Sequence, residues 1–169
     1  IGVNAQSFSP AFDTFSGSKT AIVNLADGSK VEGTVEDLDR KKGLIEEITI
    51  KDASGKKIKL LPAKIKDMYL PPSNYAKFNT AMDQVTEVSE WSNDEINNEY
   101  VKQGYAYFEN SKVFVGKKEQ VMMLQLLNPA TSKGIKVYQD PLARETAGIG
   151  FGGIDLVGGE EKSYYVKIG

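Results

Sequence analysis

"LADGSKVEGTVEDLDRKKGLIEEITIKDASGKKIKLLPAKI", residues Leu25–Ile65, alternates short β-branched runs with breaks that contain glycine or serine. The breaks are Asp27-Gly28, Lys41-Lys42-Gly43 and Ser54-Gly55. An Asp-Gly pair between alternating apolar residues is a strong signal for a β-hairpin. The stretch therefore predicts a series of short antiparallel strands joined by tight turns.

Four strands are predicted in and around this stretch. Pro62 interrupts the fourth, because proline has no backbone N–H to donate to a neighbouring strand. The four sequences are "KTAIVNL" (Lys19–Leu25), "KVEGTVEDLD" (Lys30–Asp39), "LIEEITIKD" (Leu44–Asp52) and "KKIKLLPAKIKDMYL" (Lys56–Leu70). Four short strands at close spacing are typical of a curled antiparallel sheet or a small barrel.

A helical segment is predicted after Pro71-Pro72. Residues 73–103 contain no glycine and carry apolar residues at helical spacing, which predicts a helix from Tyr75 to Glu90. Ser92 and Glu95 form a possible capping box for a second helix that runs through Lys102. Gly104 is expected to stop this second helix.

A second group of strands follows Gly104. The sequences are "YAYFENSKVFV" (Tyr105–Val115), "KKEQVMMLQLLNP" (Lys117–Pro129), "KGIKVYQDP" (Lys133–Pro141) and "EKSYYVKI" (Glu161–Ile168). The second of these has apolar residues on both faces, so we expect it to be covered on both sides. Gln125 within it is interpreted as a buried amide with backbone partners, and a ligand contact is the alternative.

The sequence therefore predicts an α+β protein that is mainly β, with two antiparallel β-units joined by a helical segment. Each unit is expected to be a small curled sheet or barrel. The predicted division is an N-terminal arm with a signal remnant (1–18), a β-meander or small barrel (19–72), a helical connector (73–103) and a second β-unit with a Gly-rich loop (104–169).

Composition excludes several classes of function. Of the 169 residues, 40% are hydrophobic and 26% are charged, and the net charge of −2 gives no general attraction to nucleic acid. No apolar run approaches the roughly 18 residues that a membrane-spanning helix needs. The chain has no His and no Cys, which removes Ser-His-Asp triads, nearly all zinc sites, disulfides and thiol chemistry. No metal or cofactor is expected.

One glycine pattern matches the G-x-G-x-x-G consensus of dinucleotide-binding sites. Gly148, Gly150 and Gly153 spell G-x-G-x-x-G, but a dinucleotide fingerprint needs a strand before it, a helix after it and an acidic residue about twenty positions on. All three are missing from the sequence around it. We interpret the pattern as a Gly-rich hairpin or flap that binds no nucleotide.

The N-terminal residues favour export. Val3-Asn4-Ala5 places small residues where a signal peptidase reads them, with Gln6 as the start of the mature chain. Ile1 to Ala5 would then be the end of an export signal. A chain that begins at an arbitrary place is the alternative. We expect an extracytoplasmic location, either periplasmic or secreted.

The second half of the sequence resembles a group of uncharacterised exported β-rich proteins of Bacteroidetes, a domain of unknown function. The strings that carry the resemblance are "YAYFEN", "MMLQLLNP", "IKVYQDP" and "GGEEKSYYVKIG". They cover about the last seventy residues well and the first half loosely. The resemblance implies a bacterial envelope setting and implies no activity. Proteins of this group often continue beyond the position equivalent to Gly169.

Two classes of function remain. The first is a non-catalytic extracytoplasmic module that binds a partner protein of the envelope or a small ligand through exposed aromatic residues. The second is an enzyme of unrecognised type with a carboxylate or tyrosine site, such as a glycan-acting hydrolase. Core packing is the alternative role for each aromatic residue. The candidate surface residues are Trp91, Tyr105, Tyr107, Tyr138, Arg144, Phe151 and Tyr165.

Overall fold

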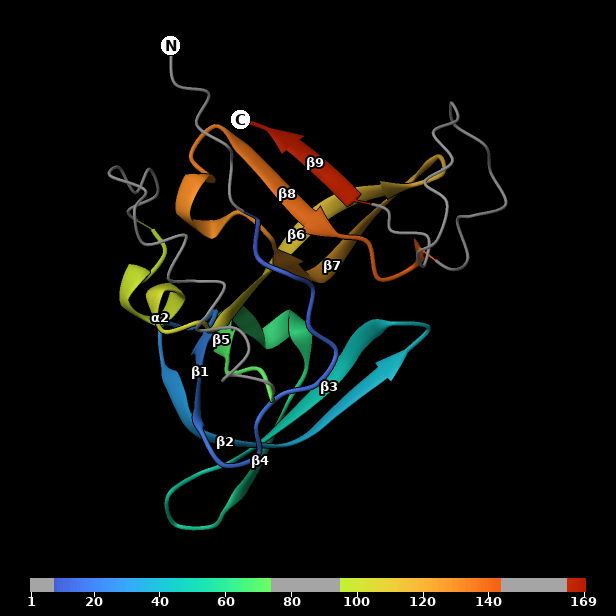
Figure 1. The fold of residues 1–169 in the computed structure, drawn as a ribbon. Coiled ribbons are helices and arrows are strands. Elements are labelled where there is room, and N and C mark those ends of the chain that lie inside the picture. Colours follow the sequence, from blue (N-terminus) through green and yellow to red (C-terminus); the bar gives the residue numbers. More distant parts are fainter. Residues whose placement is uncertain (1–7, 74–94, 144–163) are drawn as a thin grey trace.

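A computed structural model describes residues 8–73, 95–143 and 164–169, and these residues form one antiparallel sheet of nine strands (Figure 1). The strand order is β4-β3-β2-β1-β5-β6-β7-β8-β9. The prediction of a mainly β protein is confirmed. The strands are β1 (Thr20–Leu25), β2 (Lys30–Lys41), β3 (Leu44–Lys51), β4 (Lys57–Leu60), β5 (Ile65–Leu70), β6 (Ala106–Val115), β7 (Lys118–Leu126), β8 (Ile135–Gln139) and β9 (Tyr164–Ile168).

The turns of the first four strands lie where the glycine signals predict them. Gly28, Gly43 and Gly55 have φ values of 88°, 86° and 87°, in the left-handed region that glycine adopts without strain. The Asp27 carboxylate accepts hydrogen bonds from the backbone N–H and the hydroxyl of Ser29, which closes the first turn. Local turn chemistry therefore sets the positions of β1 to β4.

The fourth predicted strand is in fact two strands. The 3-10 turn η1 (Pro62–Lys64) separates β4 from β5, and the Asn110 side chain donates to the carbonyl oxygens of Pro62 and Ile65. Pro62 begins this turn because its fixed φ suits a helical first position. The chain then reverses, and β5 pairs with β1 instead of continuing β4.

The two predicted β-units are joined directly in one sheet. β5 pairs with β1 on one side and with β6 on the other, where Tyr69 lies opposite Tyr107. Figure 1 shows β5, β6 and β7 between β1 to β4 below and β8 and β9 above. The prediction of two separate sheets is therefore corrected, because pairing between distant strands joins them. The predicted helix from Tyr75 to Glu90 lies outside the described residues.

The central strands are buried on both faces. In β6, Ala106 and Phe108 contribute to a cluster under β2, β3 and β4, whereas Tyr107 contributes to a cluster on the opposite face beneath α2 and β8. In β7, Met122 and Leu124 face the second cluster and Met123 faces the first. The expected double coverage of β7 is confirmed, although Val121 near its start is 63% exposed.

The short helix α2 (Asn98–Lys102) begins later than the sequence predicts. Asn97 is its N-cap, and its side chain accepts from the N–H of Glu99. Glu95 lies before this helix, and Ser92, the other residue of the predicted capping box, lies outside the described residues. The predicted stop is confirmed, because Gly104 follows with a φ of 87°. No helix in the described part of the chain is long and apolar enough to cross a membrane.

The N-terminal arm packs on β7 through the buried side-chain amide of Gln125, beside a backbone hydrogen bond from the Ser9 N–H to the Leu127 carbonyl at 2.6 Å. Gln125 is 2% exposed, its Oε1 accepts from the N–H of Phe12 at 2.9 Å, and its Nε2 donates to the carbonyl of Pro10 at 2.9 Å. The interpretation of Gln125 as a satisfied buried amide is confirmed. Further along the arm, Phe15 forms a β-bridge with Pro72. Residues 1–7, which include the predicted signal remnant, lie outside the described residues.

Candidate functional site

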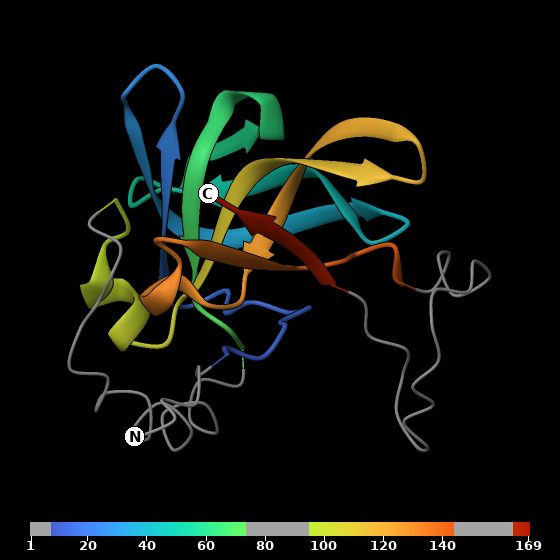
Figure 2. The ribbon, with the colours of Figure 1, turned by 90° about the horizontal axis from the view of Figure 1, so that it is seen from above.

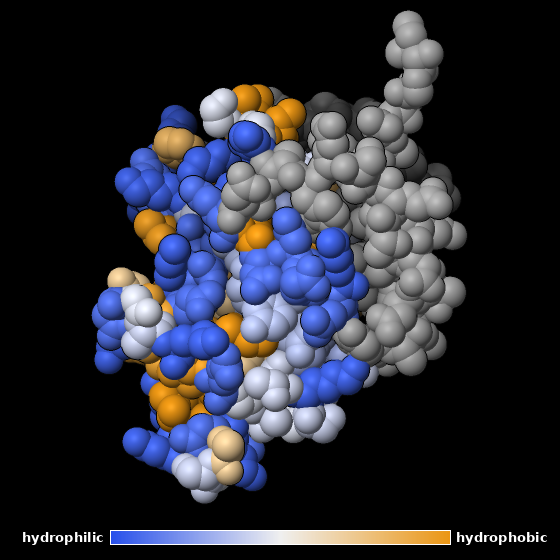
Figure 3. Space-filling view, turned by 90° about the vertical axis from the view of Figure 1, so that its left-hand side faces the viewer, coloured by the Kyte–Doolittle hydropathy of each residue, from blue (hydrophilic) through white to orange (hydrophobic). Residues whose placement is uncertain are grey.

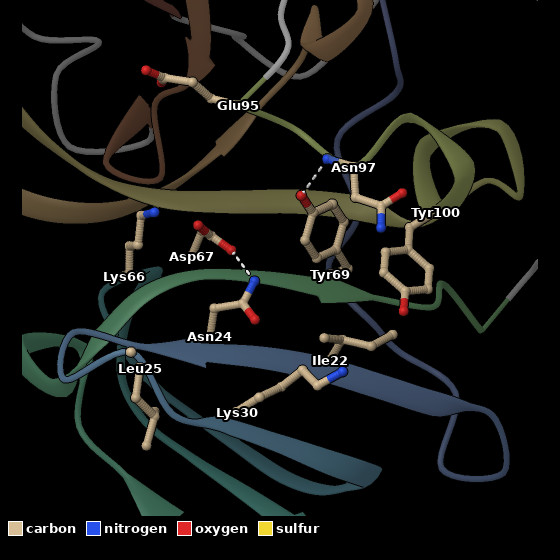
Figure 4. A pocket seen from close by; sticks show the side chains of 11 residues that line it. Ile22, Asn24, Leu25, Lys30, Lys66, Asp67, Tyr69, Glu95, Asn97 and Tyr100 are labelled. Atoms are coloured by element: carbon tan, nitrogen blue, oxygen red, sulfur yellow. Dashed lines mark hydrogen bonds between the residues drawn. The ribbon is translucent and has the colours of Figure 1, made fainter.

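A polar cleft of about 360 Å³ opens between β1, β5 and the segment that leads into α2 (Figure 4). This volume lies in the lower part of the range for small-molecule sites. Most of the side chains on its walls are polar. The lining residues are Ile22, Asn24, Leu25, Gly28, Lys30, Lys66, Asp67, Tyr69, Glu95, Asn97 and Tyr100.

A carboxylate held by an amide forms one wall of the cleft. Asn24 in β1 and Asp67 in β5 are cross-strand partners, and Asn24 Nδ2 donates to Asp67 Oδ1 at 2.6 Å. Asp67 is only 6% exposed. Burial raises the pKa of Asp67, and the hydrogen bond from Asn24 opposes that rise. The pair thus presents a fixed carboxamide oxygen and a fixed carboxylate as hydrogen-bond acceptors.

The rings of Tyr69 and Tyr100 form the other wall, and Tyr105 packs behind Tyr100. The ring centroids of Tyr69 and Tyr100 are 5.1 Å apart, and those of Tyr100 and Tyr105 are 5.6 Å apart. The Tyr69 hydroxyl accepts from the backbone N–H of Asn97 at 2.8 Å, which ties the segment before α2 to β5. Burial raises the pKa of Tyr69 to about 12, so this phenol is neutral at ordinary pH.

Charges of both signs line the cleft in equal number. Lys30 and Lys66 supply two positive charges, and Asp67 and Glu95 supply two negative ones. Lys30 also pairs with Glu32 at 2.5 Å. In Figure 4, Lys66 and Glu95 lie at the end of the cleft away from Tyr100. The described residues that line the cleft therefore carry no net charge that would select an anion or a cation.

The surface on this side of the molecule is mainly hydrophilic. Figure 3 views the molecule from the left of Figure 1, the side on which β1 and α2 are drawn. Hydrophobic atoms appear there only in small separate groups. The described residues that are visible on this side form no broad apolar patch of the kind that is typical of a protein or lipid contact.

A second polar cluster surrounds Glu109 in β6. Its carboxylate accepts from the hydroxyls of Tyr107 (3.1 Å) and Tyr138 (2.5 Å) and from the Lys136 ammonium (2.7 Å). Burial is the main cause that raises the pKa of both phenols, and the neighbouring Glu109 charge raises it further. The cluster joins β6 to β8, and each of its polar groups finds a partner, so it stabilises the sheet.

The predicted aromatic surface is divided by the structure. Tyr107 and Tyr138 are 3% and 1% exposed, so core packing, the alternative role, describes both. Tyr105 is half-buried, and its hydroxyl donates to the carbonyl of Thr20. Tyr165 is also half-buried, and burial and Asp140 raise its pKa to about 12. Trp91, Arg144 and Phe151 lie outside the described residues, as does the glycine pattern at 148–153.

The sequence did not point to the residues of the cleft. Asn24 and Asp67 are 43 positions apart and meet only because β5 returns to pair with β1. Tyr69 and Tyr100 come from different elements. The sequence feature that comes closest to indicating the cleft is the pair of tyrosines Tyr100 and Tyr105, which lie on either side of the predicted helix stop.

Neither a metal site nor a similarity to known proteins helps to identify the ligand of this cleft. Within residues 8–73, 95–143 and 164–169, no group of three or more acidic side chains could hold a metal ion. Comparison of the chain with protein-family models, curated proteins and solved structures finds no match. The resemblance to exported Bacteroidetes proteins stays a prediction.

Proposed function

We propose that the protein is a non-catalytic extracytoplasmic binding module, and that the cleft beside α2 binds a small, uncharged, polyhydroxylated ligand such as a saccharide. The pairing of Asn24 with Asp67 carries this proposal. Burying a carboxylate costs folding free energy, so a nearly buried carboxylate that an amide holds in one orientation favours a functional role. It suits a ligand that donates hydrogen bonds.

The other walls of the cleft fit the same class of ligand. Sugar hydroxyls both donate and accept, and the cleft offers acceptors at Asn24 and Asp67 and donors at Lys30 and Lys66. The half-buried ring of Tyr100 offers an apolar surface for the C–H face of a sugar. The balance of charge supports an uncharged ligand over a phosphate or a polyamine.

The test is calorimetric titration of the protein with a panel of neutral mono- and disaccharides. We expect saturable binding of at least one sugar, and Asn24→Ala or Tyr100→Ala should weaken it at least tenfold, equivalent to about 1.4 kcal/mol. The matched control is Lys112→Ala, an exposed residue of the β6–β7 hairpin that does not line the cleft.

Two outcomes would contradict the proposal. One is that no neutral sugar in the panel binds. The other is that a sugar binds with the same affinity to Asn24→Ala, Tyr100→Ala and the unmodified protein, which would place its site elsewhere. Melting temperatures of the variants show whether a loss of binding reflects unfolding. Tyr100→Phe keeps the ring and removes only the hydroxyl, so it should retain most of the affinity.

A glycan-acting hydrolase is the second candidate, favoured by one observation. Asp67 and Glu95 line the same cleft, and burial raises the pKa of Asp67, as a general acid requires. Incubation with the sugars that bind, followed by product analysis, separates the two candidates. Cleavage that Asp67→Asn abolishes would establish the hydrolase, and unchanged ligand would favour the binding module.

The extracytoplasmic location is a separate part of the proposal. It is supported by the small residues at Val3-Asn4-Ala5, which match the pattern that a signal peptidase reads. Fractionation of the source cells, with detection by an antibody against the protein, tests it. Recovery with cytoplasmic markers would contradict the location without affecting the ligand proposal.

A further inference from the structure

Strand β9 is the last strand of the sheet within the described residues. It pairs with β8 in an unbroken antiparallel register, in which Val166 lies opposite Val137 and Ile168 lies opposite Ile135. In the part of the chain that the structure describes, no strand pairs with its other side. Figure 2 shows β9 in red, alongside β8. We call this unpaired side the outer edge of β9.

The outward backbone groups of β9 follow from the hydrogen bonds of β8. The Leu127 N–H donates to the Val137 carbonyl at 2.8 Å, so the peptide groups of Val137 face β7. Peptide groups alternate in direction along a strand, so Lys136 and Tyr138 face β9 and bond to Lys167 and Tyr165. The bond from the Gly169 N–H to the Gly134 carbonyl fits the same alternation.

It follows that Tyr164, Val166 and Ile168 point their N–H and C=O groups to the outer edge. Their side chains are 51%, 61% and 77% exposed, and all three share one face of the sheet. Ile135, beside Ile168, is 41% exposed on the same face. The strand has no proline and no bulge, which are devices that protect an edge from pairing with another chain.

We propose that two copies of this chain associate through antiparallel pairing of their β9 strands, with the two-fold axis at Val166. In this register Val166 faces Val166 of the second copy, and Tyr164 faces Ile168 of the second copy. Each of these pairs exchanges two backbone hydrogen bonds, so all the outward groups of β9 are satisfied. The apolar side chains of the two strands form one continuous row across the junction.

Charge favours this register over the register whose two-fold axis lies at Lys167. With the axis at Val166, Lys167 lies opposite Tyr165 of the second copy. An axis at Lys167 would place the two Lys167 side chains directly opposite each other, which is destabilising. Because the same strand surface serves both copies, the contact closes at two subunits and does not propagate.

A cysteine crosslink tests the register directly, because the native chain contains no cysteine. Opposed residues in a hydrogen-bonded pair have Cα atoms about 5.5 Å apart, within the range for a disulfide. Under oxidation, Val166→Cys should form a covalent dimer. Tyr164→Cys alone should not, because its counterpart lies four residues, roughly 14 Å, along the strand. A mixture of Tyr164→Cys and Ile168→Cys should crosslink.

Sedimentation analysis of the unmodified protein measures the association itself. We expect a concentration-dependent dimer that Val166→Pro weakens at least tenfold, since proline removes the central N–H donor to the second copy. The Val166 N–H points away from β8, so its loss leaves the β8–β9 pairing in place. Val166→Thr, which keeps the N–H and the branched shape, is the control and should still dimerise.

Three results would overturn the proposal. They are a monomer at all concentrations, a dimer that Val166→Pro leaves unchanged, and a dimer that fails to crosslink through Val166→Cys. A larger assembly would be a fourth such result, because the proposed contact is closed. The cysteine variants keep the inference testable if Val166→Pro lowers the melting temperature.

Discussion

Gly43, in the turn between β2 and β3, packs directly against Pro141, which lies two residues after the end of β8. A Cβ atom placed on Gly43 would lie 2.3 Å from the carbonyl oxygen of Pro141. The two residues are far apart in the chain, and β3 also contacts β7 in this region. The contact shows that the sheet curls far enough for the β2–β3 turn to touch the segment after β8.

Substitution of Gly43 should therefore be costly for two separate reasons. Gly43→Ala meets both an unfavourable φ of 86° and the Pro141 backbone, and we expect it to lower the free energy of unfolding by about 2 to 4 kcal/mol. Gly28→Ala is the matched control, because φ there is 88° but no atom lies within 4 Å of the added Cβ. It should cost about 1 to 2 kcal/mol. Equal costs in denaturant titrations would contradict the packing explanation.

Strand positions could be predicted from the sequence because the signals for them are local. A turn such as Asp27-Gly28 fixes where two strands end, and alternating apolar residues fix which side is buried. β1 to β3 and β6 to β9 accordingly lie close to their predicted ranges, whereas the fourth predicted strand is divided into β4 and β5. Gln125 was interpreted correctly for a similar reason, since a polar residue within an apolar strand needs partners.

The joining of the strands into one sheet could not be predicted in this way. It depends on the reversal at Pro62, which frees β5 to pair with β1 and β6. Proline in the sequence indicates an interruption and does not indicate which strand the chain meets next. The cleft has the same origin, because Asn24 and Asp67 are brought together only by that pairing.

The Glu109 cluster should contribute more stability than an exposed ion pair in the same hairpin. Glu109→Gln removes the charge that the Tyr138 hydroxyl and Lys136 bind, and we expect a loss of about 1 to 3 kcal/mol in the free energy of unfolding. Glu119→Gln breaks the exposed pair with Lys112 and should cost less than about 1 kcal/mol. Similar losses in chemical denaturation would contradict a structural role for the cluster.

Stability should fall in alkaline solution because the buried tyrosines resist ionisation. An unfolded tyrosine ionises near pH 10, whereas the folded pKa of Tyr69 is raised to about 12 and that of Tyr107 is also raised. Above pH 10 the unfolded state therefore binds fewer protons than the native state. The contribution of Tyr69 is fully present below pH 10 and is lost as the pH rises towards 12.

The variant Tyr69→Phe isolates this effect. It removes one resistant phenol, so its free energy of unfolding should fall less steeply between about pH 10 and pH 12 than that of the unmodified protein. At neutral pH it should be less stable by about 1 kcal/mol, because the Asn97 N–H loses its acceptor. Parallel curves for the two proteins above pH 10 would show that Tyr69 does not cause the alkaline loss.

At Pro10 and Phe12, the N-terminal arm should depend on the Gln125 side chain for its attachment to β7. Gln125 both accepts from the Phe12 N–H and donates to the Pro10 carbonyl, so Gln125→Glu replaces the donor with an oxygen that repels the Pro10 carbonyl. We expect hydrogen exchange at Phe12 to become faster while exchange at Leu124 in β7 changes little. The bridge between Phe15 and Pro72 should keep the later part of the arm in place. Unchanged protection at Phe12 would mean that apolar packing of the arm, and not the Gln125 amide, holds it against the sheet.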